Sequence, residues 1–198
     1  MHFSKGRIRI IGGQYRSRVL RIAARPGLRP TPDRVRETLF NWLGQDLSGL
    51  ACLDLYAGSG ALGFEAASRG ASRVVMVESD RPTLRALEAS RAALNALQVE
   101  IIGGSAAAYL ERARERFDVV FLDPPFRQNA VPGVLRLLPG LLNATARVYA
   151  ESASPVQAPP GWREAKRARA GGVSYQLFEW EQNDSSGEIG RASCRERV

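Results

Sequence analysis

Cysteine and histidine are scarce in this 198-residue sequence, which has two Cys (Cys52 and Cys194) and one His. Two cysteines cannot form a disulfide framework, and with one histidine they leave too few ligands for a structural zinc site. No run of about 18 apolar residues is present, so no transmembrane helix is expected. The first six residues lack the apolar stretch of a signal peptide, and we expect a cytoplasmic protein without a metal or a membrane partner.

Acidic residues are almost missing from the first 42 residues, which contain ten Lys or Arg and two Asp or Glu. This segment therefore carries a formal charge of +8, and the rest of the chain, with 18 residues of each sign, sums to zero. With 44% hydrophobic residues the chain is long enough for one core but short for two full domains. The composition predicts one globular domain with a basic front, through which an anionic partner would bind.

Short apolar runs alternate with segments of helical length, a pattern typical of βαβ units around a parallel sheet. Strands are expected at residues 51–56, 73–78, 99–102, 117–122 and 146–151, and helices at 61–69, 82–97, 106–114 and 130–138. A polar strand from Trp162, a turn at Gly171-Gly172 and a returning strand over 173–180 follow. The predicted fold class is α/β, with a doubly wound, mostly parallel seven-stranded sheet that ends in an antiparallel hairpin.

The basic front has its own pattern. Residues 7–11 and 15–22, separated by Gly12-Gly13, predict a β-hairpin, and a Pro/Gly-rich linker follows at 26–30. Thr31 is expected to cap a helix with Pro32 at its first position, where the missing N–H costs nothing. The other end of the chain, from residue 188, looks like the translation of a sequencing adapter, and we exclude it from the fold.

A glycine-rich motif follows the first expected strand: Asp54-Leu-Tyr-Ala-Gly58-Ser-Gly60-Ala-Leu-Gly63. Its glycines fit the G-x-G-x-x-G pattern, and Glu78, 20 residues after Gly58, ends the second strand where a carboxylate can bind ribose hydroxyls. Asp54 at the mouth of the loop would repel the pyrophosphate of a dinucleotide. The motif therefore favours S-adenosylmethionine, which has an ammonium, a sulfonium and a ribose. The alternative is a tight strand-to-helix turn without a ligand.

A second motif, Asp123-Pro124-Pro125-Phe126, directly follows the strand at 117–122. Two prolines fix the backbone, so a carboxylate and an aromatic ring are held together at the carboxyl edge of the sheet, where ligands of open α/β sheets bind. A planar amine on a nucleobase could donate to Asp123 and to the Pro124 carbonyl while its ring stacks on Phe126. The alternative is a strand terminator with a buried Phe.

Two weaker features complete the candidate site. Ser105 and Ala106 follow the third strand, where they suit an adenine contact, a helix N-cap at Ser105, or both. Nine Arg lie between positions 7 and 36 with Asp33 as the only acid, and arginine suits bidentate phosphate contacts, although a solvated face is the alternative. The candidate contacts to nucleic-acid phosphates are Arg7, Arg9, Arg16, Arg18, Arg29, Arg34 and Arg36.

Taken together, the segments 9–18, 27–43, 54–71, 123–126 and 148–152 resemble the RsmD family of ribosomal RNA methyltransferases. The resemblance covers residues 7–182 and implies a Rossmann-like, class I fold that transfers a methyl group from S-adenosylmethionine to N2 of guanine 966 in bacterial 16S ribosomal RNA. The implied substrate is this RNA in an assembled or assembling 30S subunit, and we expect a monomer. By position, the resemblance implies cofactor contacts at Asp54, Tyr56, Gly58, Gly60, Glu78, Ser105 and Ala106, and catalytic roles for Asp123, Pro124 and Phe126.

The resemblance also divides the chain into an RNA-binding extension (1–30), a methyltransferase domain (31–182) and a tail (183–198). An adenine-N6 nucleic-acid methyltransferase would share the core but usually needs a larger target-recognition insertion. A non-catalytic RNA-binding protein with a relic cofactor pocket would be expected to lose Asp54, Glu78 or Asp123, and all three are present. A dehydrogenase is opposed by Asp54.

Overall fold

The computed structural model describes residues 7–22, 31–125 and 130–181. Its elements are β1 (Arg7–Arg9), β2 (Val19–Arg21), α1 (Asp33–Leu43), β3 (Ala51–Asp54), α2 (Ala61–Ser68), β4 (Arg73–Glu78), α3 (Arg81–Leu94), β5 (Val99–Gly103), α4 (Ala106–Arg112), β6 (Phe117–Leu122), α5 (Val131–Leu137), a 3₁₀ turn (Pro139–Leu141), β7 (Leu142–Ser152), β8 (Trp162–Ala170) and β9 (Val173–Trp180).

The main sheet has seven strands in the order β5-β4-β3-β6-β7-β9-β8. The strands from β5 to β7 are parallel, whereas β9 runs antiparallel to both β7 and β8. The predicted mostly parallel sheet with a terminal antiparallel hairpin is therefore confirmed. Strand β7 begins four residues earlier than expected, because residues 142–145 extend it beyond the apolar run.

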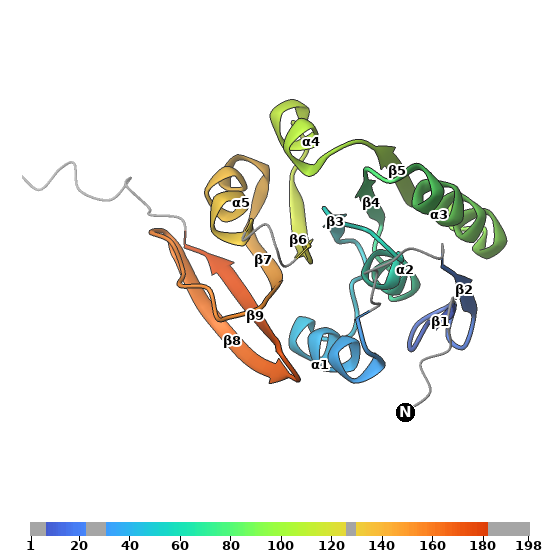
Figure 1. The fold of residues 1–198 in the computed structure, drawn as a ribbon, viewed down its shortest axis with the longest axis horizontal. Helices are drawn as coiled ribbons and strands as arrows, with labels where there is room; N and C mark the ends of the chain where they lie inside the picture. The colour runs from blue at the N-terminus through green and yellow to red at the C-terminus, as the bar shows by residue number, and fades with distance from the viewer. Residues whose placement is uncertain (1–6, 23–30, 126–129, 182–198) are drawn as a thin grey trace, which may run out of the picture.

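Helices cover both faces of this sheet (Figure 1). Helices α1, α2 and α3 pack on one face together with the β1–β2 hairpin, and α4 and α5 pack on the other. Side chains of a strand alternate between the two faces, so Cys52 points to the first core and Leu53 to the second, and both are fully buried. The expectation that Cys52 is a small core residue is confirmed.

Two local expectations at the front of the chain are wrong. Strand β2 begins at Val19 rather than at residue 15, because a turn with positive φ at Gly13 (72°) and Ser17 (68°) precedes it. Pro32, not Thr31, occupies the N-cap of α1, where no side chain caps the helix. The Thr31 side chain instead hydrogen-bonds to Glu151 at the end of β7.

The β1–β2 hairpin packs directly on the domain. Ile8, Ile10 and Leu20 are buried in the core beneath α1, α2 and α3. The hairpin turn is bonded to the end of α2, where the Gln14 N–H donates to the Ser68 carbonyl at 2.7 Å. The basic extension thus shares the core of the domain that follows it.

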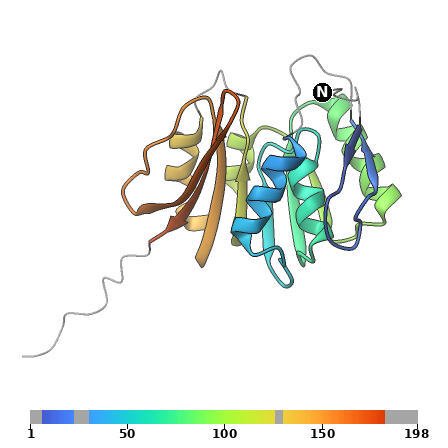
Figure 2. The same cartoon turned by 90° about the horizontal axis from the view of Figure 1, so that it is seen from below.

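Parallel strands define two opposite edges of the sheet, which we call the carboxyl edge and the amino edge after the strand ends found there. The loops that follow β3, β4, β5, β6 and β7 lie at the carboxyl edge. The turn of the β1–β2 hairpin lies at the amino edge, since it bonds to the last residue of α2 and the Arg18 guanidinium donates to the carbonyl of Ala93 near the end of α3 (Figure 2).

Candidate functional site

The glycine-rich loop after β3 is a tight turn built around Asp54. Gly58 and Gly60 have positive φ (48° and 76°), a conformation that favours glycine. A Cβ on Gly60 would come within 2.6 Å of the Phe64 ring, so the turn also needs the missing side chain. The Asp54 carboxylate accepts the Gly63 N–H at 3.0 Å and is only 2% exposed. It therefore lies behind the loop, rather than at its mouth as expected.

Glu78 joins this loop to the end of β4. One of its oxygens accepts the Gly58 N–H at 2.9 Å, and the other accepts the N–H groups of Ser79 and Asp80, both at 2.8 Å. These bonds hold Glu78 beside the glycine turn at the carboxyl edge. The position suits the expected ribose contact, because a carboxylate oxygen accepts more than one hydrogen bond.

Ser105 and Ala106 lie on the same edge, after β5. The Ser105 hydroxyl accepts the Ala108 N–H at 3.2 Å and caps α4, which confirms the N-cap expectation. Its O–H remains a donor for a ligand. Tyr56, which follows Asp54 in the loop, is partly buried and donates its backbone N–H to that carboxylate.

Asp123 follows β6 at the carboxyl edge and has an unusual environment. No donor within the described residues hydrogen-bonds to its carboxylate, which is partly exposed. Loss of water around the group raises the pKa of Asp123 well above its ordinary value, and the negative charges of Glu151 and Asp54 raise it further. The neighbouring Pro124 is buried and Pro125 is exposed. Phe126 lies outside the described residues, so its expected stacking role stays a prediction.

Glu151, at the end of β7, belongs to this site but was assigned no role by the sequence. It is 5% exposed, and the Tyr149 hydroxyl donates to its Oε1 at 2.9 Å. Burial raises the pKa of Glu151, whereas hydrogen bonds from Tyr149 and Thr31 oppose this shift. An acid that ends the apolar run Val148-Tyr-Ala-Glu151 next to the Asp123 strand is the signal that would have identified it.

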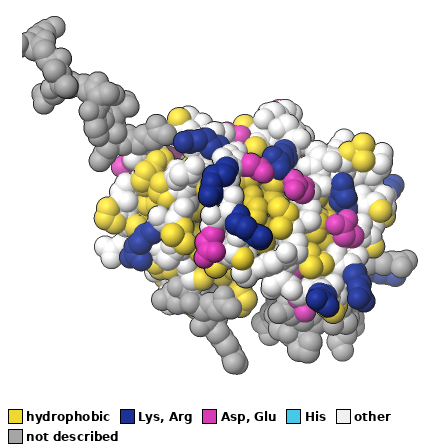
Figure 3. Space-filling model, turned by 90° about the horizontal axis from the view of Figure 1, so that it is seen from above, with side chains coloured by type: hydrophobic (Ala, Val, Ile, Leu, Met, Phe, Trp, Pro, Cys, Tyr) yellow, Lys and Arg dark blue, Asp and Glu magenta, His cyan; other side chains and the backbone are white. Residues whose placement is uncertain are grey.

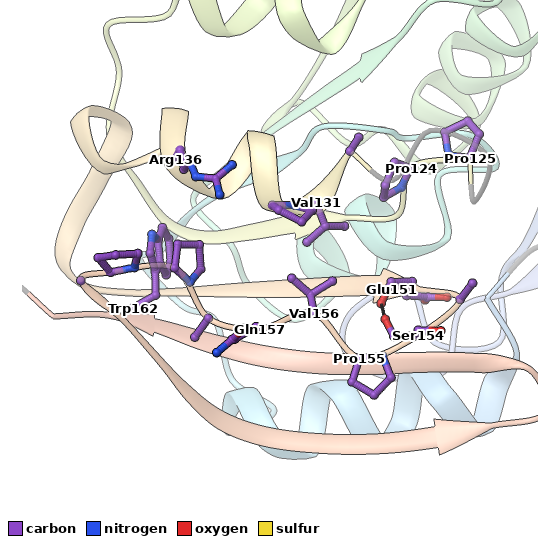
Figure 4. A pocket seen from close by; sticks show the side chains of 18 residues that line it. Pro124, Pro125, Val131, Arg136, Glu151, Ser154, Pro155, Val156, Gln157 and Trp162 are labelled. Carbon is purple, nitrogen blue, oxygen red and sulfur yellow. Dashed lines mark hydrogen bonds between the residues drawn. The ribbon is translucent and has the colours of Figure 1, made fainter.

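A cavity of about 1030 Å³ opens beside these residues, between α5 and the segment that follows β7 (Figure 4). Pro124, Pro125 and Glu151 line one end, and Arg136 and Trp162 line the other. The proline pair thus belongs both to the candidate catalytic loop and to the wall of a cavity large enough for a nucleotide.

Asp54, Asp123 and Glu151 are three carboxyl groups of this edge that lack a cationic partner within the part of the chain that the structure describes. No Arg or Lys there makes an ion pair with Asp54, Asp123 or Glu151. Buried carboxylates are costly unless cations or hydrogen-bond donors compensate them. The group therefore fits a ligand that carries positive charge and N–H groups, as S-adenosylmethionine and a nucleobase amine do. In the same residues, no cluster of His, Cys, Asp and Glu could hold a metal ion, and no helix is long and apolar enough to cross a membrane.

The candidate RNA contacts do not form one patch. Arg34 is exposed in the first turn of α1, which starts at the carboxyl edge, and Arg7 and Arg9 are exposed on β1. Arg16 and Arg18 are exposed at the hairpin turn, on the amino edge. The two edges are separated by the length of a strand, about 17 to 20 Å. Arg29 lies outside the described residues.

Arg36 is not available to RNA, and this expectation was wrong. Its side chain is 1% exposed and makes an ion pair with Glu65, which is fully buried, at 3.2 Å. It also donates to Asp33 at 2.6 Å and to the carbonyl of Arg9 at 2.9 Å. The helical spacing that places Arg34 toward solvent turns Arg36 toward α2, where it ties α1 and β1 to that helix.

The opposite side of the molecule exposes charges of both signs among the described residues. On the face that α4 and α5 cover, Lys and Arg side chains alternate with Asp and Glu (Figure 3). Arg73 illustrates this pairing, since its guanidinium makes ion pairs with Glu100 at 2.6 Å and with Glu115 at 2.5 Å. Arg112 at the end of α4 and Arg136 in α5 are also exposed and make no ion pair within the described residues, so exposed positive charge is not confined to the β1–β2 hairpin and the start of α1.

The glycine turn in front of Asp54, the acid at the end of the next strand and the acidic Pro-Pro loop after β6 define a Rossmann-like methyltransferase of the S-adenosylmethionine-dependent class. Solved structures agree with this class. Escherichia coli yhhF matches with a TM-score of 0.81 and 42% identity, over 89% of this chain and 99% of that one. The Salinibacter ruber RNA methyltransferase solved with S-adenosyl-L-homocysteine shares the fold (TM-score 0.57, 20% identity, 80% of this chain and 98% of that one).

The family is defined by sequence. The model of the family described as "Conserved hypothetical protein 95" matches residues 8–179. "Ribosomal RNA small subunit methyltransferase D" of Escherichia coli K12 is 40% identical over 190 residues, which are 93% of this chain and 96% of the relative. The Haemophilus influenzae protein of that name is 41% identical over 184 residues, covering 89% and 95%. The chain belongs to this family, the RsmD family that its motifs resemble.

Proposed function

We propose that this chain methylates the exocyclic N2 of guanine 966 in 16S ribosomal RNA. Membership of the RsmD family supports the broader activity, methylation of ribosomal RNA with S-adenosylmethionine as the methyl donor. The proposed substrate is the RNA in an assembled or assembling 30S subunit, and the proposed active species is a monomer. The choice of an amine on a base rests on the environment of Asp123.

The observation that carries this proposal is the Asp123 carboxylate, which has no donor of its own within the described residues. It stands at the carboxyl edge beside the proline-lined cavity, next to two further acids. A nucleobase amine supplies the N–H groups that such a carboxylate lacks. A hydroxyl or carbonyl substrate would satisfy it less well, because neither offers two donor hydrogens on one atom.

The residues around the turn are those that would hold the cofactor. Glu78 would bind the ribose, Gly58 and Gly60 would let the backbone approach the methionine end, and Ser105 would contact the adenine. The buried Asp54 would act through charge and by bracing the loop through Gly63. When bound, S-adenosylmethionine would supply the methyl group from its sulfonium. The leaving group would be S-adenosylhomocysteine, whose thioether sulfur is neutral.

The exocyclic amine of guanine is a poor nucleophile, because the N2 lone pair is delocalised into the ring. Hydrogen bonds from the amine to Asp123 and to the Pro124 carbonyl would localise that lone pair and stabilise the positive charge that develops on N2. After the N–C bond forms, N2 loses one proton, for which the Asp123 carboxylate is the nearby acceptor. Its raised pKa favours this role, since the carboxylate of an acid with a raised pKa is a stronger base.

RNA would be held through the exposed arginines nearest the carboxyl edge. Arg34 at the start of α1 is proposed as a phosphate contact, with Arg7 and Arg9 of β1 continuing the surface. Arg16 and Arg18 would contact the same RNA only if it extends across the hairpin to the amino edge. We propose that residues 1–30 act in this way as the RNA-binding extension of the methyltransferase domain 31–182.

The test is methyl transfer by the Asp123→Ala variant. Tritiated S-adenosylmethionine is incubated with small subunits, or with naked 16S RNA, from a strain that lacks the modification, and the labelled nucleotide is mapped. We expect the wild type to label guanine 966, and Asp123→Ala to lose at least about a hundredfold in rate while its affinity for S-adenosylhomocysteine is kept. Glu111→Gln, an exposed acid on α4, is the matched control and should keep the wild-type rate. Wild-type turnover by Asp123→Ala, or label on adenine or protein, would overturn the proposal.

A further inference from the structure

Glu151 lies directly beside Asp123 at the carboxyl edge. Strands β6 and β7 are parallel, and their register pairs Phe121 with Tyr149 and Leu122 with Ala150. Extended by one residue beyond the end of β6, this register places Asp123 opposite Glu151. Side chains paired across neighbouring strands point to the same face, about 5 Å apart. The charge of Glu151 acts on Asp123, which agrees with this proximity.

The Glu151 carboxylate is held in place by neutral donors. The Tyr149 hydroxyl donates to Oε1 at 2.9 Å, and the Thr31 hydroxyl provides a second hydrogen bond. Tyr149 is itself fully buried against the Tyr175 ring, so its hydroxyl has little freedom. A carboxylate accepts about four hydrogen bonds, and only these two come from the described residues. Glu151 therefore keeps acceptor capacity, and it lines the same cavity as Pro124 and Pro125.

The Asp-Pro-Pro loop alone cannot choose between purines. Adenine and guanine each carry an exocyclic amine that can donate to Asp123 and to the Pro124 carbonyl. They differ at the ring nitrogen next to that amine: N1 of guanine carries a hydrogen beside N2, whereas N1 of adenine is an acceptor beside N6. A second carboxylate next to Asp123 matches two adjacent donors, and it repels an acceptor lone pair.

We propose that Glu151 is a specificity-determining residue, whose carboxylate accepts the N1–H of the target guanine while Asp123 holds the N2 amine. This inference rests on the proposed function and adds to it the residue that selects guanine. The hydroxyls of Tyr149 and Thr31 orient Glu151 for this contact. The same arrangement excludes adenine, because its N1 lone pair would face a buried anion that has no cationic partner among the described residues.

The test uses 2-aminopurine in place of the target guanine, in a 16S RNA assembled into small subunits. This base keeps the 2-amine but has an unprotonated N1. Wild-type enzyme should prefer guanine over 2-aminopurine by about tenfold to a hundredfold in kcat/KM, the range expected for one hydrogen bond to a charged acceptor. In Glu151→Gln the amide oxygen can accept the Tyr149 hydroxyl and the amide N–H₂ can donate to N1. We therefore expect a slower reaction with guanine and a preference reduced at least about tenfold.

Folding and cofactor binding are measured beside the rates. Glu111→Gln is the matched control, with the wild-type preference expected. Should Glu151→Gln fail to fold, Tyr149→Phe, which removes only the orienting hydroxyl, takes its place and should reduce the preference severalfold. A folded variant with the wild-type preference would overturn the role of Glu151 and leave the proposed function intact. If the wild type fails to label guanine at all, the proposed function itself is wrong.

Discussion

Replacing Glu65 by Ala would remove the anion that holds the basic hairpin on the core. Glu65 lies in α2 and is fully buried. Its two oxygens accept the N–H groups of Ile11 at 2.9 Å and Gly12 at 2.8 Å. They also receive the guanidinium groups of Arg36 at 3.2 Å and Arg69 at 3.0 Å. One side chain thus connects the hairpin, α1 and the end of α2.

The expected cost follows from what Glu65→Ala leaves behind. Two guanidinium groups that are 1% and 7% exposed would lose their common anion, and two backbone N–H groups would lose their acceptor. Breaking a buried ion pair by removing one partner costs about 3 to 5 kcal/mol. For a domain of this size, each kcal/mol lowers Tm by about 2 to 4 °C, so Tm should fall by about 6 to 20 °C.

Urea denaturation and thermal unfolding measure this loss, and hydrogen exchange locates it. The amides of Ile11 and Gly12 should exchange faster in Glu65→Ala, because the hairpin loses its anchor. The matched control is Glu88→Ala on α3, where an exposed ion pair with Arg91 is removed and a change within about 0.5 kcal/mol is expected. A loss below about 1 kcal/mol in Glu65→Ala, with unchanged exchange at the hairpin, would refute this account of the network.

Two further predictions concern single positions. Gly13→Ala should destabilise the protein by more than about 1 kcal/mol in urea denaturation, because φ is +72° there and a Cβ would lie 1.7 Å from the Ser68 carbonyl oxygen; Gly172→Ala, with open space around it, should change stability by less than about 0.5 kcal/mol. Burial raises the pKa of Asp54 from 3.8 to about 7, so the folded protein disfavours its charged form. Without cofactor, the free energy of unfolding should therefore decrease as the pH rises from about 4 to about 7, by up to about 4 kcal/mol. Asp54→Asn should lose this slope, and equal slopes in both proteins would contradict the assignment.

The fold was predictable because the pattern of neighbouring residues indicates each βαβ unit. The apolar runs at β3, β4 and β6 are buried on both faces, which is why they stand out as continuous stretches. The ends of the helices were less predictable. α3 stops at Leu94 because Asn95 takes a left-handed conformation (φ 51°), and a helical pattern does not reveal this.

The site was predictable where one short motif supplies all the parts. Asp54, Gly58 and Glu78 lie close together because the loop and the next strand fix their spacing; the Gly63 N–H donates to Asp54, and the Gly58 N–H donates to Glu78. Arg36 was misassigned because its partner, Glu65, lies 29 residues away on another helix. The signal was present, since α2 is otherwise made of small and apolar residues and an acid in such a helix must be buried.

Two acidic environments among the described residues, around Glu65 and at the carboxyl edge, differ in how far their charge is compensated, and we use that difference to distinguish a structural role from a ligand-binding one. Glu65 receives two cations and two backbone N–H groups, so nothing remains for a ligand. Asp123 receives no donor from the described residues, and Glu151 receives only two hydroxyls. Folding alone gives no reason to keep carboxylates uncompensated, because apolar residues would be more stable there. A cationic cofactor and a base with adjacent N–H groups would explain these carboxylates. Both ligands would bring positive charge or hydrogen-bond donors to the carboxyl edge, as two arginines and two backbone N–H groups do for Glu65.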